Sequence, residues 1–215
     1  MKTFIYISTL LFSSVMGAQN VFFNTGVNMT TYDYSNSSGE NNNNIQPSNG
    51  AFYEMGYGIP INFSSRGRGD GRYSRLKIKI SLTLNEYNAT GGNSFDNYDW
   101  QTQYLGLRTN LEYFILDTDF FTVALDGGVG VELLLNGKQK IGGTTYNLKD
   151  HDEFKSIFIT PKLGLNLVYN INEAVGLSGG FNLSKAISAK LKKSSVESVS
   201  FNNSQFIFGI SLQIY

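Results

Sequence analysis

The stretch that most constrains this chain is its last one, from Gln205 to Tyr215, because apolar and polar residues alternate along it. A period of two indicates a β-strand with one apolar and one polar face. About 9–11 residues of tilted strand cross the hydrocarbon of a bilayer. The apolar face carries Phe206, Phe208, Ile210, Leu212 and Ile214, and the opposite face carries Gln205, Gly209, Ser211 and Gln213, with Ile207 as its apolar exception.

The same alternation recurs in seven earlier segments, so the sequence predicts eight strands. They cover about residues 23–32, 51–63, 75–84, 104–115, 121–133, 157–170 and 175–184. Long predicted loops (34–50, 87–100, 136–153 and 186–203) alternate with short turns (64–72, 117–119 and 172–173). This order is typical of an up-and-down antiparallel sheet, and closure into a barrel would remove its two exposed edges.

The two faces of the strands predict which solvent each one meets. The apolar face is nearly free of charge, whereas the polar face is rich in small residues and carries charges of both signs. We therefore expect an all-β, eight-stranded transmembrane barrel rather than a soluble lipocalin-type barrel with an apolar cavity. The charges predicted to pair in the lumen as a structural network are Glu54, Arg75, Lys77, Lys79, Arg108, Glu112, Asp126, Glu132 and Lys162.

Two further expectations concern the strands themselves. Aromatic residues on the apolar face near the short turns should form an interfacial girdle, made of Phe63, Tyr113, Phe121 and Tyr169. Pro60 and Pro161 fall inside predicted strands, where each removes a ladder donor, so we expect a bulge at each.

The start of the chain predicts export. Residues 1–18 combine a lysine, an apolar run and small residues before Gln19, as a signal peptide does, which leaves 19–215 as one barrel domain. The chain has no cysteine, so disulfide and thiolate-metal chemistry are excluded. Lys plus Arg equals Asp plus Glu at 17 each, and this balance argues against a nucleic-acid partner.

The alternating closing strand that stops at Tyr215, together with the eight-strand pattern, resembles the OmpA/OmpX-type family of outer-membrane β-barrels. The resemblance implies an outer-membrane location, outer-membrane lipids as neighbours and the barrel-insertion machinery as a partner that recognises the last strand. A monomer is expected. Some family members anchor the cell wall through a soluble domain after the barrel, and no such domain is expected here.

These patterns predict a structural barrel that makes surface contacts through four long loops, with a lumen closed to most solutes and a surface ligand that the sequence does not name. A narrow channel for water, ions or small solutes is one alternative. A rim-located lipid-modifying enzyme is another, with His151 and Ser156 as its candidate groups. No His-x-Ser motif accompanies His151, so no catalytic residue is predicted. Asp150-His151-Asp152-Glu153 could ligate a divalent metal, but a solvated loop is the preferred interpretation, so no metal or cofactor is predicted. Arg68-Gly69-Asp70 spells an adhesion tripeptide but lies in a predicted short turn.

Overall fold

The computed structural model describes residues 20–35, 45–61, 75–92, 97–150, 157–189 and 198–214. These residues form strands almost throughout. The strands are β1 (Asn20–Ser35), β2 (Ile45–Pro60), β3 (Leu76–Gly92), β4 (Asn97–Asp117), β5 (Phe121–Ile141), β6 (Thr144–Asn147), β7 (Phe158–Asn170), β8 (Val175–Ser188) and β9 (Ser198–Gln213).

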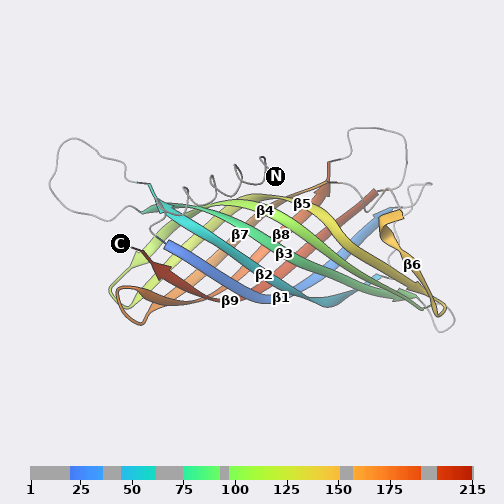
Figure 1. Ribbon diagram of the computed structural model, residues 1–215, viewed down its shortest axis with the longest axis horizontal. Helices are drawn as coiled ribbons and strands as arrows, with labels where there is room; N and C mark the ends of the chain where they lie inside the picture. Colours follow the sequence, from blue (N-terminus) through green and yellow to red (C-terminus); the bar gives the residue numbers. More distant parts are fainter. Residues whose placement is uncertain are drawn as a thin grey trace, which may run out of the picture.

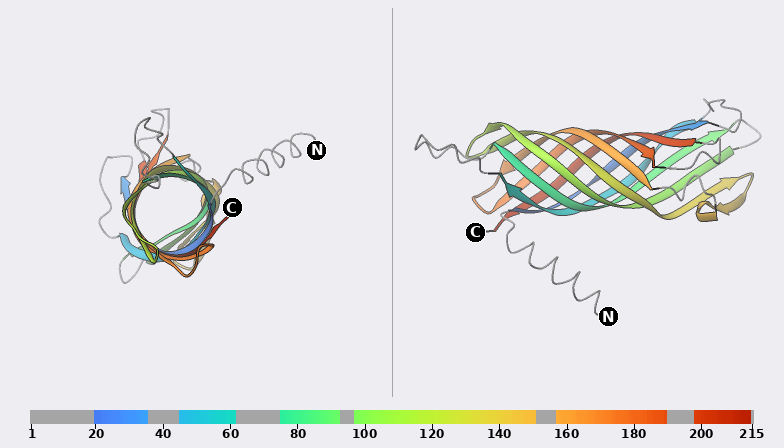
Figure 2. Two further views of the ribbon diagram at one scale, coloured as in Figure 1. Left: turned by 90° about the vertical axis from the view of Figure 1, so that its left-hand side faces the viewer. Right: turned by 90° about the horizontal axis from the view of Figure 1, so that it is seen from above.

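Eight of these strands, all except β6, close into an antiparallel barrel. Each is hydrogen-bonded to its neighbours in the chain, and β1 pairs with β9 over its whole length, from Asn20 opposite Gln213 to Ser35 opposite Ser198. Figure 1 shows the strands tilted around a common axis, and Figure 2 shows the ring that they make when viewed along it. Closure leaves none of the eight as an open edge, and it confirms the predicted fold.

The two ends of the barrel differ. At one end, called here the turn end, lie the starts of β1 and β3, the finish of β9, and the connections 118–120 and 171–174. At the other, the loop end, lie the connections between β1 and β2, β3 and β4, β5 and β7, and β8 and β9. In Figure 1 the turn end is on the left and the loop end, which carries β6, is on the right.

The strands at the loop end are longer than the sequence predicted, so the predicted long loops are corrected. Residues 45–50 belong to β2, and β3 and β4 approach each other until only 93–96 separate them. β5 continues to Ile141, β8 continues to Ser188, and β9 already begins at Ser198. The reason is that backbone pairing continues beyond the apolar part of a strand, because every N–H and C=O still needs a partner.

Beyond Glu132, β5 still pairs with β4 but loses its other partner, because β7 begins at Phe158, opposite Glu132. Residues 138–141 pair instead with β6 in a hairpin that turns through Gly142 and Gly143, with φ of 53° and 86°. Positive φ at both central residues is the requirement of a tight hairpin turn, which glycine meets without steric cost. The chain then enters a short 3₁₀ turn, η1 (Leu148–Asp150). Among the described residues, no helix is long and apolar enough to cross a membrane.

The prediction of bulges at the two prolines was wrong. Pro60 is the last residue of β2, where a missing donor costs little. Pro161 faces outward, and pairing with β8 lapses around it but resumes in the same register at Lys162. The register shifts among the described strands occur instead at Ser48/Phe52, Gln103/Tyr104 and Phe114/Leu116.

Side chains alternate between outside and inside as predicted. The outward positions form an apolar belt on all eight barrel strands, represented by Phe23, Met55, Leu82, Leu107, Leu125, Leu165, Leu177 and Phe208, all 44–67% exposed. Three of the four predicted girdle residues, Tyr113, Phe121 and Tyr169, lie at its turn-end border, and the rings of Phe121 and Tyr169 are 5.2 Å apart. Phe63 lies outside the described residues.

Glycines make room for the larger side chains inside the barrel. Several inward amides lie directly against a glycine of the neighbouring strand, where an added Cβ would collide with the amide oxygen. The cross-strand pairs are Asn24 with Gly209, Asn110 with Gly128, and Asn182 with Gly164. Each of these asparagine side chains therefore fits inside the barrel because the residue that faces it on the neighbouring strand has no side chain.

Candidate functional site: the barrel lumen

The interior is polar at its middle, as the sequence predicted. The buried side chains there are charged or carry amides and hydroxyls, and they come from every barrel strand: Asn24, Asn28, Glu54, Ser81, Thr83, Asn85, Arg108, Asn110, Glu112, Asp126, Glu132, Thr160, Lys162, Asn182 and Gln205. A charge taken out of water is tolerated only when it is paired and hydrogen-bonded. The pairing inside the lumen therefore decides whether the barrel is stable.

Arg108 forms the centre of the first ion-pair group and is only 2% exposed. Its Nη2 lies 3.5 Å from Oε1 of Glu132, and its Nη1 lies 4.0 Å from Oε1 of Glu54. Ser81 and Asn24 also donate to Glu54, at 2.7 and 2.8 Å. One cation therefore serves two carboxylates, and neutral donors stabilise the excess negative charge.

Glu132 has a similar set of neutral donors. The Tyr87 hydroxyl donates to its Oε2 at 2.9 Å, and Asn85 donates to its Oε1 at 3.2 Å. These donors come from β3, whereas Glu132 comes from β5 and Arg108 from β4. Because Glu54 comes from β2 and its donor Asn24 from β1, the group joins five consecutive strands, β1 to β5.

The second ion-pair group lies nearer the turn end and holds three lysines and two carboxylates. Glu112 accepts from Lys79 at 3.2 Å and lies 3.4 Å from Lys77. Asp126 lies 3.6 Å from Lys79 and 3.7 Å from Lys162. Asn166 donates to Asp126 at 3.0 Å. Here the cations are in excess, which complements the excess of carboxylates around Arg108.

Eight of the nine charges that the sequence placed in the network lie in these two groups. The exception is Arg75, which is exposed just before β3 begins. Its backbone carbonyl accepts a hydrogen bond from Phe114 at 2.8 Å, but the position lies at the turn end rather than inside the lumen. The predicted strand 75–84 placed Arg75 with Lys77 and Lys79, and the sequence alone gives no depth along the barrel axis.

An aromatic cluster occupies the loop-end half of the interior, and the sequence did not predict it. Ring centroids of Tyr32 and Phe201 are 4.5 Å apart, and those of Phe158 and Phe201 are 4.8 Å apart. The Tyr32 hydroxyl donates to the Tyr87 carbonyl at 2.8 Å. The buried members are Tyr32, Ile45, Tyr87, Ala89, Trp100, Tyr104, Leu148, Phe158, Ala186, Val199 and Phe201.

Leu148 belongs to this cluster but comes from η1 rather than from a barrel strand. It is fully buried, whereas the four residues of β6 just before it are all exposed. The hairpin at the loop end is therefore attached to the barrel interior through one apolar side chain. This inward turn of the chain could not be read from a segment that the sequence pattern assigned to a loop.

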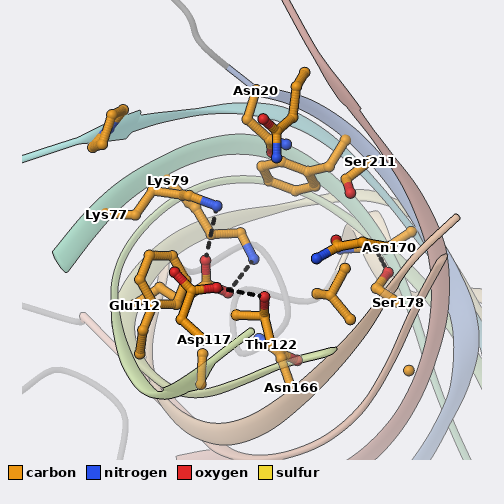
Figure 3. Close-up of a pocket in the computed structure, with 18 of the residues that line it drawn as sticks. Asn20, Lys77, Lys79, Glu112, Asp117, Thr122, Asn166, Asn170, Ser178 and Ser211 are labelled. Atoms are coloured by element: carbon orange, nitrogen blue, oxygen red, sulfur yellow. Dashed lines mark hydrogen bonds and ion pairs between the residues drawn. The ribbon is translucent and has the colours of Figure 1, made fainter. Parts of the chain in front are cut away.

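A cavity of about 430 Å³ occupies the turn-end half of the lumen. Figure 3 shows Lys77, Lys79 and Glu112 together on one wall, with Asn170 and Ser178 on the wall opposite. Phe22 and Phe114 also line it, and each ring lies beneath a lysine: Lys79 Nζ is 4.7 Å from the Phe22 centroid, and Lys77 Nζ is 4.9 Å from that of Phe114. The lumen thus has three layers: cavity, ion-pair groups and aromatic cluster.

Several sequence motifs lie outside the described residues. These are residues 1–18, His151, Ser156 and the Arg68–Asp70 tripeptide. No described residue therefore supports the lipid-enzyme alternative. Among the described residues, no group of three or more potential metal ligands is found.

No family model matches the chain, and no curated protein matches it. Among solved structures, it is similar to Neisserial surface protein A, with 12% identity and a TM-score of 0.46 over 90% of this chain and 97% of that one. It is also similar to the outer membrane protein OprG from Pseudomonas aeruginosa, with 10% identity and a TM-score of 0.45 over 93% of this chain and 97% of that one. The similarity to Ail of Yersinia pestis has 10% identity and a TM-score of 0.41 over 91% of this chain and 99% of that one. The function proposed below is derived from this chain's own residues.

Proposed function

We propose that the protein is an integral outer-membrane barrel whose role is carried by its loop end at the cell surface, and not by conduction through its lumen. The location is supported by the apolar belt, since soluble proteins rarely expose apolar patches larger than a few hundred Å². Outward charges such as Asp33 and Lys140 lie near the loop ends of their strands, beyond the belt. A closed barrel also pairs its backbone internally, as the hydrocarbon requires.

The aromatic cluster is the observation that carries the proposed role. Tyr104, Phe158 and Phe201 are all 0% exposed, and their rings are within van der Waals reach of one another at the barrel's loop end. Below them, Arg108 reaches toward carboxylates on two other strands. An ion would have to displace both layers. Eight strands give an interior just wide enough for side chains to fill, so we propose a closed lumen.

A narrow path for water or small ions is the second candidate, and the turn-end cavity is what favours it. The turn-end half of the lumen is hollow, with Lys77 and Lys79 partly exposed to it. If both the ion-pair groups and the aromatic cluster opened, this cavity would be continuous with the loop end.

Planar-bilayer recording separates these candidates. We expect no large, steady conductance from the unmutated protein. Tyr104→Ala combined with Phe201→Ala should increase the frequency of current steps, because it removes two rings from the cluster. Phe208→Ala is the matched control, since Phe208 lies on β9 like Phe201 but is 67% exposed on the outer face. Large, steady currents from the unmutated protein would establish the channel and overturn the proposal.

A further inference from the structure

We propose that the turn-end cavity is a binding site for a small organic anion that carries a carboxylate or phosphate on a polar body. This inference does not depend on the proposed surface role. The cavity volume, about 430 Å³, falls within the range of small-molecule sites. The site would open toward the turn end, on the opposite side of the ion-pair groups from the aromatic cluster.

Four charged side chains line the cavity, the ammonium groups of Lys77 and Lys79 and the carboxylates of Glu112 and Asp117. The ion-pair group behind this lining holds three ammonium groups, those of Lys77, Lys79 and Lys162, and only two carboxylates, Glu112 and Asp126. The lysines that line the cavity are also the more exposed partners: the Lys77 side chain is 20% exposed and that of Lys79 is 12%, against 5% for Glu112. An ammonium has three donors, so both lysines can hold Glu112 and still donate to a ligand.

Further negative charge lies deeper in the barrel. Around Arg108 the excess is reversed, with one guanidinium between Glu54 and Glu132. The two groups together make a charge separation along the axis, with its positive side toward the cavity. Asp117 is the remaining anion of the lining. It is exposed, and its Oδ1 accepts from the Thr122 hydroxyl at 2.9 Å.

The rest of the lining fits the polar body of such a ligand. Asn170 and Ser211 provide an amide and a hydroxyl on the wall across from the lysines, and Asn20 provides an amide between the two walls, as Figure 3 shows. Amides and hydroxyls both donate and accept, so they suit hydroxyl or amide groups of a ligand. The phenyl rings of Phe22 and Phe114 lie beneath the two ammonium groups, which restricts where the lysines can move.

Glucuronate and glucose are matched probes, because only glucuronate carries a carboxylate. Glucose 6-phosphate tests whether the site also accepts a phosphate. Each is titrated into the refolded, ¹⁵N-labelled barrel in micelles while amide shifts are followed. We expect saturable shifts at Lys77, Lys79 and Glu112 with both anions, weakened by salt, and none with glucose. Equal shifts with glucose would show a neutral polyol site, and the absence of saturable shifts with either anion would show a solvent-filled cavity. Either result would overturn the proposal.

Lys77→Met should weaken the affinity for both anions about tenfold or more, the loss expected for one charge-assisted hydrogen bond. Glu112 keeps Lys79 as a partner in this variant, so the barrel is expected to refold, and Lys77→Arg should retain binding. Lys185→Met is the control, because Lys185 is exposed on β8 near the loop end, away from the cavity. Equal affinity in Lys77→Met and the unmutated barrel would contradict the assignment.

Discussion

Arg108→Met is expected to destabilise the barrel by about 3–5 kcal/mol, the cost of removing one partner from a buried ion pair. The variant leaves two carboxylates, Glu54 and Glu132, at 3% and 1% exposure without the guanidinium between them. Their neutral donors remain, but hydrogen bonds alone do not offset the burial of an uncompensated charge. Methionine retains much of the side-chain volume, so the loss reports charge rather than a cavity.

The measurement is urea unfolding of the barrel from lipid vesicles. Arg108→Met combined with Glu132→Gln restores the charge balance of the group, since one cation and one anion are removed together. The double variant should recover part of the lost stability, because only Glu54 is left without the guanidinium, and the oxygen of the introduced amide can still accept from the Tyr87 hydroxyl, which lies 2.9 Å from Glu132. A double variant as unstable as the single one would contradict the charge-balance explanation.

Leu165→Arg should destabilise the barrel by about 2–4 kcal/mol, the cost measured for arginine near the middle of a bilayer. Leu165 is 50% exposed and central in the outward apolar run of β7, which extends from Ile157 to Ile171. Its cross-strand neighbours, Leu125 and Phe181, are also outward and apolar. An arginine there has no partner and no water within the belt.

Gln101→Arg provides the control for position along the axis. Gln101 is exposed on β4 toward the loop end, beyond the apolar belt, so its replacement should cost about 0–1 kcal/mol. Both variants are compared by unfolding from the same vesicles. If Leu165→Arg were as stable as Gln101→Arg, the outward face would not be in contact with hydrocarbon.

The faces of the strands could be predicted from sequence because lipid and lumen select different side chains at alternate positions. Leu82 and Thr83 illustrate this, one 48% exposed and the other 1%. Alternation also placed Lys77 and Glu112 on the inward face, and the β3–β4 register, which continues from Leu76 opposite Tyr113, brings them opposite each other. Local pattern and short-range register therefore determined most of the fold.

The loop end could not be predicted in this way, because the polar and apolar faces of its strands are reversed. On β3, Glu86, Asn88 and Thr90 lie on the outer face, whereas Tyr87 and Ala89 are buried in the aromatic cluster while the backbone continues to pair with β4. The aromatic cluster was missed for a related reason. Tyr32, Tyr104 and Phe201 lie far apart in sequence and meet only when β1 pairs with β9 and closes the barrel. Their inward position alone was the available signal.

The most direct test of the central claim, a barrel that spans the outer membrane with its loop end outside, is cysteine labelling on intact cells. The chain has no cysteine, so each introduced thiol is unique. Thr145→Cys lies on exposed β6 at the loop end, and Ala174→Cys lies in the exposed β7–β8 turn. A membrane-impermeant maleimide should label Thr145→Cys directly and Ala174→Cys only after the outer membrane is permeabilised. Labelling of Ala174→Cys alone on intact cells would contradict the orientation, and equal labelling of both in a soluble fraction would contradict the membrane location.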